Sequence, residues 1–117
     1  MGVIFHQQVV RVRAGTRTDR AGNTVPDWSP GAVDRLLITR LSVQPSVQSE
    51  RTEADRTSVV TGWRVLSAPG TAPDVQAGDR IEYDGLVCEV DGEVGRWRDP
   101  VTGRSHHAEW AMRRSTG

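Results

Sequence analysis

The chain is poor in the residues that most often carry out chemistry or bind cofactors. Its 117 residues include one cysteine, three histidines, one tyrosine and one phenylalanine, and its formal net charge is zero. A single cysteine excludes an intramolecular disulfide framework. Zero net charge argues against a dedicated nucleic-acid binder, which carries a basic excess, although it is compatible with local basic patches.

Long apolar runs are also absent, at the N-terminus and elsewhere. Without them we expect no signal peptide and no membrane span, and hence a protein made and kept in a cytoplasm-like compartment. No stretch shows three turns of amphipathic helix. The length suits one domain, residues 1–117, and an apolar share of 36% predicts a small core with much loop.

The strongest structural signal is a β-hairpin within residues 79–97. Alternating residues 80–83 and the β-formers 86–90 flank Asp84-Gly85, a pair that accepts positive φ at both positions. A two-residue turn sets Ile81 opposite Cys88, and it sets Arg80 opposite Glu89 on the other face. The face predicted to point into the core comprises Ile81, Tyr83, Leu86, Cys88 and Val90.

Four further β-rich runs are separated by turn signals, at residues 9–13, 36–43, 59–68 and 107–114. With the hairpin they make about six short strands, which predicts an all-β fold, a small antiparallel β-barrel. Residues 1–8 show no period, and we expect a mobile arm or a short turn there. Residues 14–31 are rich in turn formers, and Asp, Gly and Asn at 19–23 predict a hairpin tip there.

The strand at residues 36–43 carries apolar side chains on both faces. Simple alternation places Leu37, Leu41 and Val43 on one face and Leu36 with Ile38 on the other. A strand of this kind is buried on two sides, so its second face needs cover from a local helix or another subunit.

Residues 46–58 form the longest polar stretch. It carries many charges and only two small apolar residues, too few to offset the entropy of ordering it. We therefore expect a long mobile loop, with a short helix as the weaker alternative. Long loops within compact domains are usually functional.

No arrangement of residues predicts catalysis, a metal site or a cofactor. Adjacent His106 and His107 in a strand point to opposite faces and suit no shared metal ion. Arg96-Trp97-Arg98 is compatible with a stacking platform for a nucleic-acid base, but we favour packing of Trp97 on the barrel end. Four tryptophans are too many for so small a core, so at least one is expected to be buried only on assembly.

The C-terminal two-thirds of the chain, residues 36–117, resembles a family of phage proteins. The resemblance rests on the order and spacing of short motifs: residues 41–45, the polar loop with Glu50 and Arg56, 60–62, 68–70, 74–75, 78–81, Gly85, 88–92, 96–97, 99–103 and 111–114. These are similar to the head completion, head closure or stopper proteins of the head-to-tail connector of long-tailed bacteriophages. Cys88 departs from the pattern, standing where a larger aromatic residue is expected.

The resemblance implies a structural virion protein, not an enzyme, that forms a ring below the portal and its adaptor at the head–tail junction. It implies as partners further copies of the chain, the portal-bound adaptor protein, a tail terminator or tail-completion protein, and packaged DNA in the channel; assembly would take place in the bacterial host cytoplasm. The long loop would project into the channel and help to retain DNA. The residues expected in this gate loop are Ser49, Glu50, Arg51, Thr52, Glu53, Ala54, Asp55, Arg56 and Thr57.

Side chains expected at subunit or ring interfaces are Trp28, Leu36, Ile38, Arg96, Trp97 and Trp110. The alternative hypothesis is a stand-alone barrel that binds single-stranded nucleic acid through Trp97, Trp110 and nearby arginines.

Overall fold

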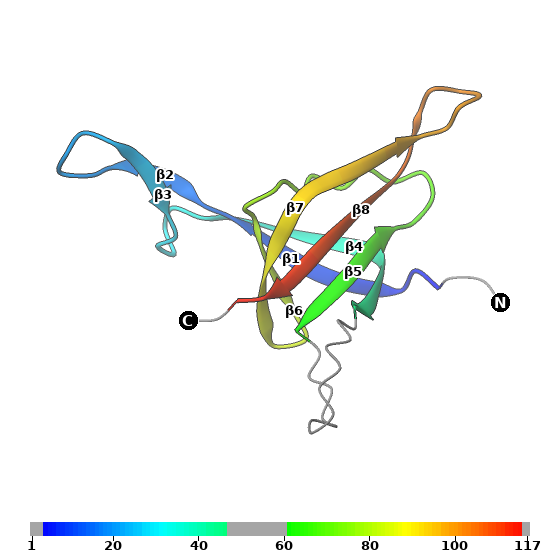
Figure 1. Cartoon of the computed structure of the whole chain (residues 1–117), viewed down its shortest axis with the longest axis horizontal. Helices are drawn as coiled ribbons and strands as arrows, with labels where there is room; N and C mark the ends of the chain where they lie inside the picture. The colour runs from blue at the N-terminus through cyan, green and yellow to red at the C-terminus, as the bar shows by residue number, and fades with distance from the viewer. Residues whose placement is uncertain (1–3, 47–60, 116–117) are drawn as a thin grey trace, which may run out of the picture.

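A closed six-stranded antiparallel barrel forms the body of the protein (Figure 1). The structure, a computed structural model, describes residues 4–46 and 61–115. Around the barrel the strands follow the order β1-β4-β5-β8-β7-β6, and β2 with β3 forms a separate two-stranded sheet. The strands are β1 (Gln7–Arg13), β2 (Gly15–Thr18), β3 (Thr24–Asp27), β4 (Asp34–Ser46), β5 (Gly62–Ser67), β6 (Arg80–Tyr83), β7 (Leu86–Arg98) and β8 (Ser105–Arg114). The predicted all-β barrel is confirmed.

The β6–β7 hairpin has the predicted turn and register. Asp84 and Gly85 both have positive φ, 50° and 78°, as a two-residue hairpin turn requires. Ile81 pairs with Cys88 and Arg80 with Glu89. Because the side chains of Ile81 and Cys88 are fully buried, the face predicted to point inward does so.

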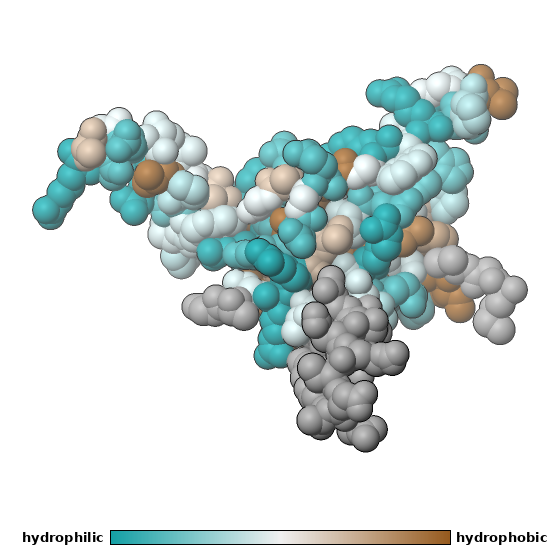
Figure 2. Space-filling view, in the orientation of Figure 1, coloured by the Kyte–Doolittle hydropathy of each residue, from teal (hydrophilic) through white to brown (hydrophobic). Residues whose placement is uncertain are grey.

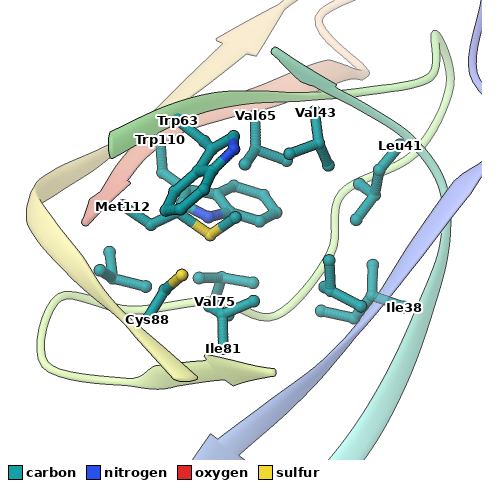
Figure 3. Packing of buried hydrophobic residues seen from close by; sticks show 12 residues of the cluster. Ile38, Leu41, Val43, Trp63, Val65, Val75, Ile81, Cys88, Trp110 and Met112 are labelled. Carbon is teal, nitrogen blue, oxygen red and sulfur yellow. The ribbon is translucent and has the colours of Figure 1, made fainter. Parts of the chain in front are cut away.

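The core lies inside the barrel and is built around two tryptophans (Figure 3). Trp63 of β5 and Trp110 of β8 are 7% and 1% exposed. The expected interface position of Trp110 is therefore wrong: alternation places it on the inner face of β8 with Ala108 and Met112, both buried. Cys88 lies in the same core, where burial raises the pKa of its thiol. The remaining members of the cluster are Val9, Ile38, Leu41, Val43, Val65, Val75, Ile81 and Val90.

Strand β4 changes face at a bulge, so the face assignment predicted for it is wrong. Gln7 pairs with Leu41 but Val9 pairs with Ile38, so β4 has one residue more than β1 across this interval. Arg40, with a φ of 59°, absorbs the change. Ile38 is consequently in the core at 6% exposure and does not lie at an expected interface, while Leu37 is 56% exposed.

Two further boundaries differ from those predicted. Gln7 and Gln8 already belong to β1, so they are not part of an N-terminal arm; the Gln7 side-chain carbonyl accepts a hydrogen bond from the Val43 backbone N–H at 2.8 Å. The second strand of the hairpin, predicted over residues 86–90, instead continues to Arg98 through an irregularity between Asp91 and Gly95. The extra residues there lengthen β7 to thirteen residues without breaking it.

We predict that Gly85→Val lowers the free energy of unfolding by about 1–3 kcal/mol, because a β-branched residue is strained at positive φ. Chemical denaturation monitored by tryptophan fluorescence measures the loss. Val87→Thr, a change on the exposed outer face of the same hairpin, is the control and should have little effect. An unchanged midpoint for the Gly85 variant would contradict the turn assignment.

Candidate assembly surfaces

The first candidate surface is the β2–β3 ribbon, here called the arm, which projects from the barrel into solvent (Figure 1). Its strands pair with each other from Gly15–Asp27 to Thr18–Thr24, and among the described residues neither pairs with the barrel. At the predicted tip the Asp19 carboxylate accepts hydrogen bonds from the backbone N–H groups of Ala21 and Asn23. Because two-stranded ribbons are only marginally stable alone, the arm needs support at its base or from a partner.

Close packing and an aromatic contact fix the base of the arm. A Cβ atom at Gly15 would lie 2.5 Å from the Ala32 carbonyl oxygen, so only glycine fits without a shift. The guanidinium of Arg80 lies 3.8 Å from the ring centroid of Trp28, a cation–π contact from the barrel to the arm. Trp28, one of the residues expected at an interface, is therefore half-buried within its own subunit.

An ion network ties both stems of the arm to the end of the barrel. Arg11, only 1% exposed, pairs with Asp34 at the start of β4 and with Asp74 at 3.2 Å. Arg13, the last residue of β1, pairs with Asp74 at 3.2 Å and with buried Asp79 at 2.9 Å. The network therefore joins the strand entering the arm, the strand leaving it, and the β5–β6 connection.

Within this network, Arg13 and Asp74 favour the ionised form of each other. The hydrogen bond from Arg13 holds the pKa of Asp74 below its ordinary value, and hydrogen bonds to Asp79 and Asp74 raise the pKa of Arg13. A buried guanidinium is costly unless its charge is paired, and Asp34 and Asp74 provide that pairing for Arg11. The network is therefore a strong constraint on where the arm begins.

The second candidate surface surrounds Trp97 on the part of β7 and β8 that extends beyond the barrel. Trp97 is 46% exposed, and its ring stacks on that of His107 with centroids 5.2 Å apart and an interplanar angle of 8°. A Cβ atom at Gly95 would collide with the Trp97 ring at 2.2 Å, so the indole lies against the Gly95 backbone. Figure 2 shows apolar atoms at the end of this extension, where Val101 is 90% exposed.

The charged and titratable groups beside Trp97 are engaged within the subunit. Arg96 donates hydrogen bonds to the carbonyl oxygens of Pro73 and Val75, and Arg98 donates to that of Gly103. His107 contacts the Glu109 carboxylate at 3.1 Å; burial opposes ionisation of Glu109, but hydrogen bonds from His107 and Arg64 outweigh it and lower its pKa.

The two histidines do not point apart as predicted. A register shift at this point pairs Trp97 with His107 and Arg98 with Ser105, which leaves His106 as an extra residue in β8. The irregular backbone brings the two Nδ1 atoms within 2.8 Å of each other.

The third candidate surface is a groove of about 260 Å³ between the first half of β4 and the β5–β6 connection. Leu36 and Leu37 line one side, and Thr71 and Pro73 line the other. On this side of β4, pairing with β5 stops at Leu41, and the Ala68 N–H donates to the Arg40 carbonyl at 3.0 Å. Among the described residues, no backbone group hydrogen-bonds to this edge of β4 from residue 34 to 39. An exposed apolar strand edge of this kind readily pairs with another strand.

The residues expected at interfaces do not form one surface. Leu36 lies in the groove, Arg96 and Trp97 on the β7–β8 extension, and Trp28 at the base of the arm. The predicted gate loop, residues 49–57, lies outside the described residues. Sequence reasoning missed the arm as a separate ribbon, the exposure of Leu37 and the burial of Arg11. The Val–Arg alternation of residues 10–13 gave no signal of this burial, because it places Arg11 on the strand face opposite Val10 and Val12.

Within 4–46 and 61–115, no three histidine, cysteine or acidic residues are placed to hold a metal ion. The same residues include no helix with the length and hydropathy of a membrane span.

Comparison with known proteins supports the fold alone. No family model matches the chain, and no curated protein matches it. The chain is similar to the solution structure of protein SF1141 from Shigella flexneri 2a, a structural genomics target, with a TM-score of 0.56 and 15% identity. The match covers 97% of this chain and 96% of that one.

We predict that Gly15→Ala displaces the base of the arm, because its methyl group would overlap the Ala32 carbonyl. The expected result is a shift of the Trp28 indole resonance in a ¹H–¹⁵N NMR spectrum and a loss of about 1–3 kcal/mol in stability. Gly31→Ala is the matched control, since a Cβ atom there meets no neighbour within 4 Å. Equal effects of the two variants would contradict the close approach at Gly15.

A second prediction concerns the ion network at low pH. Because the folded-state pKa of Asp74 is below its ordinary value of 3.8, its contribution to stability is present above that pH and is lost as the pH falls through the folded-state pKa. Asp74→Asn should therefore destabilise the protein at pH 7 and progressively less below pH about 4. Urea denaturation across this range measures the difference.

The control for the acid series is Asp91→Asn, an exposed carboxylate outside every ion pair formed among the described residues. This substitution should change the free energy of unfolding little across the whole pH range. If the difference in unfolding free energy between wild type and Asp74→Asn stays constant down to pH 2, the assigned pairing is contradicted.

Proposed function

We propose that the protein is a structural virion protein of the head-to-tail connector of a tailed bacteriophage. In this proposal its copies form a ring below the portal and adaptor, close the DNA-filled head and provide the docking surface for the tail. The ring would contact the adaptor on one side and a tail terminator or tail-completion protein on the other. The ordered series of sequence motifs in residues 36–117 is the first support.

The arm is the observation that carries this proposal. It is held at its base by the Gly15 contact and the Arg11–Arg13 network, yet its strands pair with no other described strand. An element that is anchored firmly but supported nowhere along its length suits a protein that completes its contacts in an assembly. Head-to-tail contacts between identical subunits close into rings when the rotation permits.

The alternative, a stand-alone binder of single-stranded nucleic acid, has less support. Trp110 is unavailable because it lies in the core, and the guanidinium groups of Arg96 and Arg98 are bonded to backbone carbonyls. Among the described residues, the Trp97–His107 stack favours it, since a partly exposed indole offers a surface for a base.

Electron microscopy of the purified chain at high concentration tests the connector proposal. We expect closed rings of uniform diameter, together with a concentration-dependent rise in sedimentation coefficient. A fluorescent oligonucleotide titrated at low and moderate salt tests the alternative. Tight, salt-sensitive binding by a chain that stays monomeric at all concentrations would overturn the connector proposal in favour of the nucleic-acid binder.

A further inference from the structure

We propose that the arm of one copy of this chain docks in the β4 groove of a second copy and adds strand β2 to the open edge of β4. This inference deepens the proposed function, on which it rests for the ring, by naming the surfaces that join neighbouring subunits. It follows from two incomplete β-elements in the same molecule.

The first incomplete element is the edge of β4. The edge from residue 34 to 39 has backbone groups without a partner among the described residues, and it carries Leu36 and Leu37 at 39% and 56% exposure. Edge strands in stable monomers are normally protected by charge, proline or a covering segment. Here Thr71 and Pro73 line the opposite side of the groove and do not cover the strand edge, so a volume of about 260 Å³ stays open between them and β4. An added strand would satisfy the backbone and cover both leucines.

The second incomplete element is the outer edge of β2. Both strands of the arm have one edge without a pairing strand among the described residues, but β3 contains Pro26, which has no N–H to donate. Strand β2, with the sequence GTRT, contains no proline. Thr16 lies opposite Pro26 in the ribbon. Strand β2 is therefore the edge of the arm that is competent to pair.

The chemistry of the arm also matches the groove. Because opposed and alternate residues share a face, Thr16, Thr18, Thr24 and Pro26 form one face of the ribbon. All four are exposed and uncharged. The groove lining, which includes Leu36, Leu37, Thr71 and Pro73, is uncharged as well. Neither surface would bury an unpaired charge in the contact.

Geometry favours a second copy over the arm's own barrel. The arm leaves the barrel end and points away from it (Figure 1), and the Gly15 contact and the ion network fix that direction. The contact is therefore heterologous, with arm and groove at different places on each subunit. Repetition of such a contact generates a ring or a filament.

Disulfide trapping between two separately purified variants tests the contact. One batch carries Thr16→Cys or Thr18→Cys; the other, enlarged by a fused tag, carries Leu37→Cys. The three positions are exposed, so the variants should fold, which circular dichroism melts verify. Native Cys88 is buried and should stay out of the exchange. After mixing with a mild oxidant, a mixed disulfide dimer is expected on a non-reducing gel, because a docked strand brings the two Cα atoms within disulfide range.

The matched control replaces Leu37→Cys with Val101→Cys, which is apolar, 90% exposed and on the β7–β8 turn. The yield of mixed dimer with the Leu37 partner should exceed that of the control roughly tenfold or more, because docking raises the effective concentration of the two thiols. Leu37→Lys should abolish self-association in sedimentation, whereas Val101→Lys should preserve it.

The outcomes separate this inference from the connector proposal. Rings without the mixed dimer would overturn the arm–groove contact and leave the connector proposal standing. A specific mixed dimer without rings would support the contact and count against the ring. Equal yields with both partners would show random collision and overturn the contact. If neither rings nor the mixed dimer form, both proposals are overturned.

Discussion

The burial of Arg11 is the constraint on which the outline of the molecule depends. Its guanidinium is almost completely removed from solvent, so its charge must be met by carboxylates brought to it by other segments. Asp34 and Asp74 meet it from the start of β4 and from the β5–β6 connection, and Arg13 extends the network to Asp79. The barrel end, both stems of the arm and the connection that walls the groove are thus positioned by one set of charges.

The barrel leaves part of the β-structure unpaired: the first half of β4 has an open edge, and the arm lies outside the barrel. Strand β4 has thirteen residues, but β5 pairs only with its second half. The residues between β3 and β4 return the chain to the barrel without covering the first half. A monomer built in this way leaves both a strand edge and a ribbon unpartnered, and one contact between copies satisfies both. In the proposed connector, this contact would join neighbouring copies of the chain.

Alternation and turn chemistry predicted well wherever the strands are regular. The Asp84-Gly85 turn sets the β6–β7 register, and the inner faces of β5 and β8 follow period-two alternation through Trp63, Val65, Trp110 and Met112. The same rule failed for β4. A bulge at Arg40 interrupts the alternation, so Ile38 and Leu41, three residues apart, both point into the core. Of the candidate interface residues, Leu36 and Trp97 are exposed, whereas Ile38 and Trp110 are buried; composition showed a surplus of tryptophan but not which ring the core would take.

The sequence by itself determined the fold class, the central hairpin and its register, and the hairpin tip at residues 19–23. Each of these depends on neighbouring residues: alternation along a strand, positive φ at a turn, or a carboxylate that caps nearby N–H groups. Only the tertiary structure decided that Arg11 is buried, that the arm stands apart from the barrel and that half of β4 has an open edge. Those features depend on where distant segments meet, since a buried charge or an unpaired edge is defined by partners far away in the chain.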